Sequence, residues 1–233
     1  MNAENITDLI EKASQLCDAG NLTEALAVYS RVLSQDADHH EACLVAGSIY
    51  GETGQIDEAA KLLKKATELK PDDAAGYLTL AHVLRAQGDL PQAINTLENA
   101  VLACPENVEV CCTLGSMRHD AGQLAEAIQC FERATQLDSD NTRAREMLNS
   151  LLIHNADILA RNGNHAEALE AIQPFLESGN PPLSAVLVFA TLSPVFDTRD
   201  DCRYLLDKIS ERGSLSDADR GAIQQARAWL DQN

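Results

Sequence analysis

Apolar residues recur at helical spacing on both sides of five glycines in this chain. Before Gly88, one helical face carries Tyr77, Leu80, Ala81 and Leu84. After Gly88, a second helical face carries Ala93, Ile94, Leu97, Ala100 and Val101. A chain that leaves a helix often needs a left-handed residue, which glycine supplies. The pattern therefore predicts two helices joined by a tight turn.

The same pattern returns at a fixed interval. The segments AGNLTEAL, TGQIDEAA, QGDLPQAI, AGQLAEAI and NGNHAEAL contain Gly20, Gly54, Gly88, Gly122 and Gly163. Their glycines are separated by 34, 34, 34 and 41 residues. A period of this length is typical of stacked structural repeats.

Small residues stand where the two helices of each unit are expected to cross. On the first helices they are Gly47, Ala81, Gly115 and Ala156, and on the second helices Ala59, Ala93, Ala127 and Ala168. A larger side chain at such a crossing would overpack it, at a cost of about 1–3 kcal/mol. Pro91 suits the first turn of a helix, and Pro105 ends that helix.

This unit resembles the tetratricopeptide repeat, a 34-residue helix–turn–helix pattern. Residues 40–73 and 74–107 carry it most fully; residues 108–141 have Ser139 in place of its proline, and residues 6–39 match more loosely. The resemblance implies an all-α, right-handed superhelical solenoid of antiparallel helix pairs. We expect about six repeats and a C-terminal capping helix.

The longer interval before Gly163 comes from seven additional residues, TRAREML (142–148). Seven residues add nearly two full helical turns, so the apolar face is preserved. Residues 1–141 then form four regular units (6–39, 40–73, 74–107 and 108–141), and residues 142–182 a fifth. We expect its first helix to span about residues 142–161 and to protrude past the stack. A loop at TRAREML is the alternative, although the segment is rich in helix formers.

Residues 183–233 predict a degenerate sixth unit and the capping helix. Pro194 is expected to cut the first helix of this unit short, and the turn glycine is absent. Cys202, Leu206 and Ile209 mark the inner face of its partner helix. Ser216 with Asp219 resembles a capping box that opens the final helix.

The resemblance implies that the first helices line a concave groove, where ligands of the family most often lie. The groove-facing positions hold Leu44, Ser48, Leu78, His82, Arg85, Cys112, Ser116, His119, Ile153 and Asp157. This mixed surface suits an extended peptide or an amphipathic helix. The alternative is a solvated face without a ligand. Family members that clamp acidic chaperone tails use Lys and Asn in the groove, and this chain lacks both there.

Metal and catalytic chemistry find little support in the sequence. His82 and His119 suggest a metal site with Cys112 or Asp157, but histidines in a groove are more often hydrogen-bonded or solvated. The spacing of Cys104, Cys111, Cys112 and Cys130 matches no zinc template. The chain has no phosphate-binding loop and no motif of a zinc protease or serine hydrolase. We expect no enzyme activity, no cofactor and no metal.

Net charge and cysteine content limit the classes of partner and the cellular compartment that the sequence favours. The net charge of −18 disfavours nucleic acid and anionic membranes, and leaves a basic or amphipathic protein partner open. The start of the chain lacks the features of a secretory signal, and no stretch is long enough for a membrane span. Seven cysteines in amphipathic helices are expected to be reduced thiols, which indicates a cytoplasmic protein.

The first functional hypothesis is a non-catalytic scaffold that binds a peptide or helix in the groove. A second is the N-terminal repeat domain of a larger bacterial enzyme, of the glycosyltransferase or sulfotransferase type, since similar arrays precede such domains. A third is a self-assembling scaffold, because decayed final repeats leave apolar surface that another copy can cover, so a homo-oligomer stays open.

Overall fold

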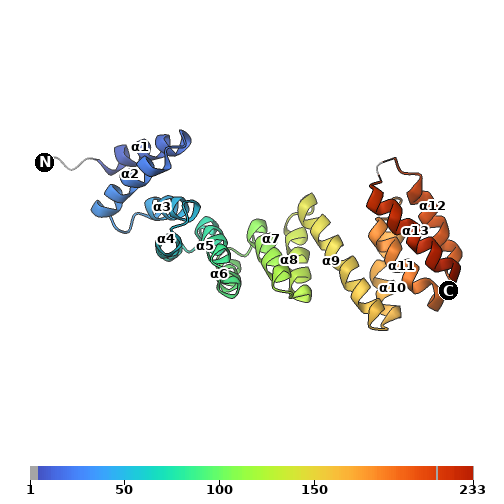
Figure 1. Cartoon of the computed structure of the whole chain (residues 1–233). Helices are drawn as coiled ribbons and strands as arrows, with labels where there is room; N and C mark the ends of the chain where they lie inside the picture. The colour runs from blue at the N-terminus through green and yellow to red at the C-terminus, as the bar shows by residue number, and fades with distance from the viewer. Residues whose placement is uncertain (1–4, 214, 233) are drawn as a thin grey trace. The chain divides into compact units, whose positions relative to one another are not determined.

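The computed structural model describes residues 5–213 and 215–232, and the helices it contains account for nearly all of them (Figure 1). Residues 1–4, 214 and 233, which belong to the first and last predicted segments, lie outside the described residues. The helices are α1 (Ile6–Asp18), α2 (Leu22–Gln35), α3 (His40–Glu52), α4 (Ile56–Leu69), α5 (Ala74–Ala86), α6 (Leu90–Ala103), α7 (Val108–Asp120), α8 (Leu124–Leu137), α9 (Thr142–Arg161), α10 (His165–Leu176), α11 (Leu183–Phe196), α12 (Arg199–Ser210) and α13 (Asp217–Gln232). The described chain is an all-α helical repeat solenoid, as the sequence predicts.

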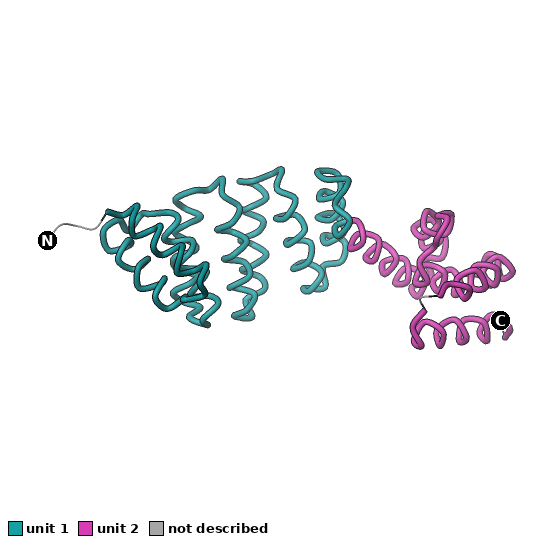
Figure 2. The backbone as a smooth tube through the Cα atoms, turned by 90° about the horizontal axis from the view of Figure 1, so that it is seen from above, with its two compact units in different colours: residues 1–144 teal, residues 145–233 magenta. Residues whose placement is uncertain are grey.

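The chain divides into two compact units, residues 1–144 and residues 145–233 (Figure 2). In the first unit, α1 to α8 form four consecutive antiparallel pairs, and the second helix of each pair also packs on the first helix of the next. In the second unit, α10 to α13 pack around one hydrophobic cluster. Each unit therefore has its own core.

Helix pairs in the first unit approach closely because a small residue on the first helix meets a large one on the second. A Cβ atom added to Gly47 would lie 2.7 Å from Leu63 Cγ, and one added to Gly115 would lie 2.8 Å from Phe131 Cε2. Ala81 and Leu97 stand at the corresponding positions of α5 and α6, and both are fully buried. The predicted small residues of the second helices, Ala59, Ala93, Ala127 and Ala168, are fully buried too.

The predicted turn glycines all adopt the left-handed conformation. Gly88 has φ +84°, and the N–H of the next residue, Asp89, donates to the carbonyl of Leu84 at 3.0 Å. This bond closes the end of α5 before α6 begins. Between α11 and α12, where no glycine is present, Asp197 takes the left-handed role with φ 54°.

The extended helix predicted from TRAREML is present, because α9 runs without a break from Thr142 to Arg161. The side chain of Asn141 opens it by accepting a hydrogen bond from the N–H of Ala144 at 2.9 Å. Within α9, Leu151 is buried, whereas Met147, Leu148, Leu152 and Leu159 are half-buried. The loop alternative is excluded, and the protrusion of the last turns stays a prediction.

The prediction that Pro194 cuts its helix short is wrong. Pro194 lies inside α11, which continues to Phe196. A proline inside a helix leaves the carbonyl four residues earlier without its N–H donor, here the carbonyl of Ala190. The hydroxyl of Ser193, which is fully buried, donates to that carbonyl at 2.8 Å. This local bond replaces the missing one and lets the helix pass through the proline.

The C-terminal helix has the predicted start. The side chains of Ser216 and Asp219 bond each other's backbone N–H, which is the geometry of a capping box. Ile223 and Leu230 of α13 are buried in the cluster of the second unit, and Ala226 packs at its edge. Cys202, Leu206 and Ile209 of α12 are fully buried in the same cluster, as predicted.

We predict that Gly115→Val lowers the free energy of unfolding by about 1–3 kcal/mol, because the new side chain overlaps the ring of Phe131. Urea denaturation measures the change. Gly221→Val is the matched control, since no heavy atom lies within 4 Å of its added Cβ. Equal effects of the two substitutions would show that the crossing at Gly115 does not depend on a small residue.

Candidate functional site

The first and second helices of the N-terminal unit form two opposite faces. The first helix α5 contacts both α3 and α7, the first helices of the neighbouring pairs. We call the face lined by α1, α3, α5 and α7 the inner face, and the face lined by α2, α4, α6 and α8 the outer face. The predicted groove residues of this unit stand on first helices.

Eight of the ten predicted groove residues belong to the N-terminal unit, and all of them offer surface to solvent. Five are half-buried, namely Leu44, Ser48, Leu78, Cys112 and Ser116. Three are exposed, namely His82, Arg85 and His119. The half-buried set forms a mixed apolar and hydroxyl-bearing floor, to which the exposed set adds nitrogen groups.

Arg85 and Ser116 are already engaged within the chain. The guanidinium of Arg85 forms an ion pair with Asp120 at 2.8 Å, which links α5 to α7. The hydroxyl of Ser116 donates to the carbonyl of Cys112 at 3.0 Å, within α7. A ligand that uses Arg85 must therefore compete with Asp120.

Exposed carboxylates on the same first helices were missed in the sequence prediction. Glu41 and Glu109 lie in the first turns of α3 and α7, and Glu52 and Asp120 lie at the opposite ends of these helices. Their spacing matches the groove positions, seven residues before Ser48 and Ser116 and four residues after them. That spacing was a signal that could have revealed them.

The two remaining predicted residues, Ile153 and Asp157, lie in the C-terminal unit. Ile153 is 5% exposed and belongs to the hydrophobic cluster of that unit, so it offers little surface to a ligand. Asp157 is half-buried and pairs with Arg161 at 2.7 Å. Both line a cavity of about 470 Å³ between α9 and α11. The structure therefore does not place them in one site with the other eight.

The structure gives no support to a metal centre. Among the described residues, no three His, Cys, Asp or Glu side chains lie close enough together to hold a metal ion. All seven cysteines are free thiols; Cys43, Cys111 and Cys202 are buried, and the other four are half-buried. Burial raises the pKa of Cys130 to about 11 and that of Cys202 to about 12. These thiols are therefore protonated near neutral pH and are poor ligands and nucleophiles.

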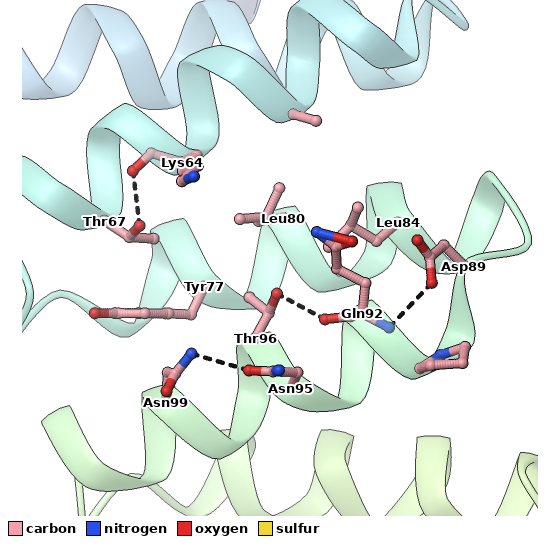
Figure 3. Close-up of a pocket in the computed structure, with 12 residues that line it drawn as sticks. Lys64, Thr67, Tyr77, Leu80, Leu84, Asp89, Gln92, Asn95, Thr96 and Asn99 are labelled. Carbon is pink, nitrogen blue, oxygen red and sulfur yellow. Dashed lines mark hydrogen bonds between the residues drawn. The ribbon is translucent and has the colours of Figure 1, made fainter.

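The outer face contains a cavity of about 600 Å³ that sequence reasoning missed (Figure 3). We call it the α4–α6 furrow, because those helices form its walls and α5 forms its floor. Leu80 and Leu84 lie on the floor, Lys64 projects from the α4 wall, and Asn95 and Asn99 line the α6 wall. The side chain of Asn99 donates to Asn95 Oδ1 at 3.2 Å.

The two neighbouring spaces on the outer face differ from this furrow. Between α2 and α4 lies a smaller cavity of about 380 Å³, floored by Ala46 and Tyr50. Between α6 and α8, Arg118 stands at the position of Leu84 and Glu98 at that of Lys64. Arg118 bonds Glu98 at 2.6 Å, so an ion pair occupies this third space.

The repeats match models of one protein family. One model of the tetratricopeptide repeat matches residues 16–83 and 52–110, and a second matches residues 108–141. Together they cover residues 16–141, which is more than half of the chain. The chain belongs to the tetratricopeptide repeat family. Among curated proteins, no match to this chain was found.

Solved tetratricopeptide repeat structures share the fold at low sequence identity. YrrB, described as a tetratricopeptide protein with an unusual peptide-binding site, is 22% identical with a TM-score of 0.56, covering 84% of this chain and 94% of its own. MamA from Desulfovibrio magneticus is 19% identical with a TM-score of 0.57, covering 73% and 93%. A repeat protein from Parabacteroides merdae is 15% identical with a TM-score of 0.56, covering 98% and 99%.

A helix that crosses a membrane must be both long and apolar. Among the helices of residues 5–213 and 215–232, none combines the required length with the required hydropathy.

We predict that the buried thiols of the folded protein resist alkylation. With iodoacetamide at pH 8, about one thiol in 10⁴ is thiolate at a pKa near 12, so Cys202 should remain unmodified. Half-buried Cys17 should react first, although burial also raises its pKa. Peptide mass spectrometry gives the rates, and labelling in urea is the control in which all seven thiols should react. Modification of Cys202 as fast as Cys17 would contradict the packing of α12.

Proposed function

We propose that this chain is a non-catalytic scaffold that binds an extended peptide or an amphipathic helix along the inner face of its N-terminal unit. The observation that carries the proposal is the half-buried floor of that face. Leu44 of α3, Leu78 of α5 and Cys112 of α7 are equivalent residues of successive repeats. A ligand that lies across the repeats can therefore place apolar side chains at regular intervals.

Charge favours a basic partner. Glu41 and Glu109 lie at one end of this floor, and Glu52 lies at the other, where Asp120 is already paired with Arg85. The whole chain has a net charge of −18, so its field also attracts cationic segments. The ligand that fits best is an amphipathic peptide with Lys or Arg on both sides of an apolar stripe. An acidic chaperone tail does not fit, because the groove positions lack the Lys and Asn of the carboxylate clamp.

The family supports the general role. Repeat proteins of this kind act as interaction scaffolds, and YrrB is described by its peptide-binding site. At 22% identity, the likeness to YrrB shows that the two proteins share a fold. The partner has to be inferred from the residues of this chain. Those residues support protein binding and supply no catalytic motif.

The proposal predicts selective loss of binding when the charge at the inner face is reversed. The probe is a fluorescein-labelled 15-residue amphipathic peptide of Leu and Lys, and fluorescence anisotropy measures its dissociation constant. Glu109→Lys should weaken binding about tenfold or more, which corresponds to about 1.4 kcal/mol. Leu78→Ser should also weaken binding, because it removes apolar contact.

The matched control is Glu132→Lys, which makes the same charge change at an exposed position of α8 on the outer face. It should change the dissociation constant less than threefold, roughly the effect of overall charge at physiological salt. If Glu132→Lys weakens binding as much as Glu109→Lys, the peptide responds to net charge and the groove is not its site.

A further inference from the structure

We propose that the α4–α6 furrow of the outer face is a second binding site, for an extended peptide that carries a carboxylate and an apolar side chain. This site lies on the face opposite the inner face and takes a ligand of opposite charge. The proposal of this second site therefore does not depend on the function proposed above.

The first argument is a lysine of the furrow that no ion pair neutralises within the described part of the chain. Four of the six lysines in the chain are Lys61, Lys64, Lys65 and Lys70, on α4 or at its end. Lys65 pairs with Asp38 at 2.8 Å. Lys64 lines the furrow and has no ion-pair partner among the residues that the structure describes. Its ammonium is therefore available to a carboxylate.

Asp89, at the end of the furrow near the start of α6, is the carboxylate that opposes this charge. Its Oδ1 already accepts the N–H of Gln92 at 3.1 Å, as the cap of α6. Lys64 and Asp89 are thus at different places along the furrow (Figure 3). A ligand carboxylate at Lys64 avoids Asp89 by pointing toward the opposite end.

The second argument is an amide pair that fits a peptide backbone. Because Asn99 donates to Asn95 Oδ1, the NH₂ group of Asn95 and the carbonyl of Asn99 are left for a ligand. A donor and an acceptor one helical turn apart match the N–H and C=O groups that an extended peptide offers. Gln92, one turn before Asn95, adds a further exposed amide.

The third argument is an apolar residue where the repeat otherwise has polar ones. Leu102 lies on α6 three residues after Asn99, next to the residues that line the furrow, and is 81% exposed. The equivalent positions of α2, α4 and α8 hold Ser34, Glu68 and Gln136. With this exposure, most of the Leu102 side chain lies outside the core. A ligand side chain that packs against Leu102 would remove it from water.

The fourth argument is the contrast with the next repeat. The equivalent space between α6 and α8 is occupied by Arg118 and Glu98, while Arg133, at the position of Asn99, donates to the carbonyl of Pro105 at 2.8 Å. Side chains of the chain itself therefore fill the space between α6 and α8. The α4–α6 furrow, in contrast, is open.

The test begins with a displayed library of random heptapeptides selected on the whole chain. Enriched sequences are synthesised with a fluorescein label, and their dissociation constants are measured by anisotropy at physiological salt. We expect a class of peptides that contains Asp or Glu together with Leu, Ile or Phe. The decisive variant is Lys64→Glu with Leu84→Arg, which copies the natural pair of the next repeat. It should weaken this class at least about tenfold.

Leu102→Ser is the second variant, and it copies the residue of α2. Because Leu102 is exposed, this change preserves the fold, and it should weaken the same peptides at least threefold, about 0.7 kcal/mol. Lys61→Glu, one turn earlier on α4 at the neighbouring cavity, is the matched charge control and should have less than a threefold effect. Glu109→Lys, on the inner face, should leave these peptides bound.

The proposal is overturned if the selection yields no peptide. It is likewise overturned if no selected peptide binds more weakly both to the Lys64→Glu, Leu84→Arg variant and to the Leu102→Ser variant. It is also overturned if Lys61→Glu weakens binding as much as the decisive variant, since the peptides would then respond to net charge. Loss of binding with Glu109→Lys would assign the peptides to the inner face. Circular dichroism of each variant separates loss of the site from loss of the fold.

Discussion

The structure of the N-terminal unit depends on the contact of a small residue in each first helix with a large residue in the second. Gly47 meets Leu63, and Gly115 meets Phe131, at distances that leave no room for an added Cβ atom. This contact repeats every 34 residues, with Ala81 and Leu97 in the middle pair. Because the distance between the two helices is set in the same way each time, the pairs stack in a regular array.

Both candidate surfaces follow from this regularity. On the inner face, successive first helices contact one another, so Leu44, Leu78 and Cys112 occupy equivalent positions on neighbouring helices. On the outer face, the second helices are walls of spaces whose floor is the first helix between them. The fold thus supplies equivalent places, and a few surface substitutions decide which of them is open. Leu84 leaves one space open, whereas Arg118 closes the next with Glu98.

Much of the fold was predictable because it depends on periodic and local signals. The glycine spacing gave the turns, and the seven additional residues gave the length of α9. Pro194 was misjudged because its effect depends on one hydrogen bond, from Ser193 to the carbonyl of Ala190, which no helical pattern encodes. The burial of Ile153 could not be predicted from the groove positions, since it comes from packing within the C-terminal unit. The α4–α6 furrow depends on which side chains fill a surface space, and polar residues on second helices look alike in sequence.

Native-state hydrogen exchange of the Ala81→Leu variant tests the dependence on helix crossing most directly. The added side chain must displace α6 at Leu97, and each helix of this pair also packs on its neighbours. The account predicts that the amides of α4, α5, α6 and α7 lose protection together relative to the unsubstituted chain, while those of α11 and α12 keep theirs. Unchanged protection throughout α4 to α7, or a loss confined to α5, would contradict it.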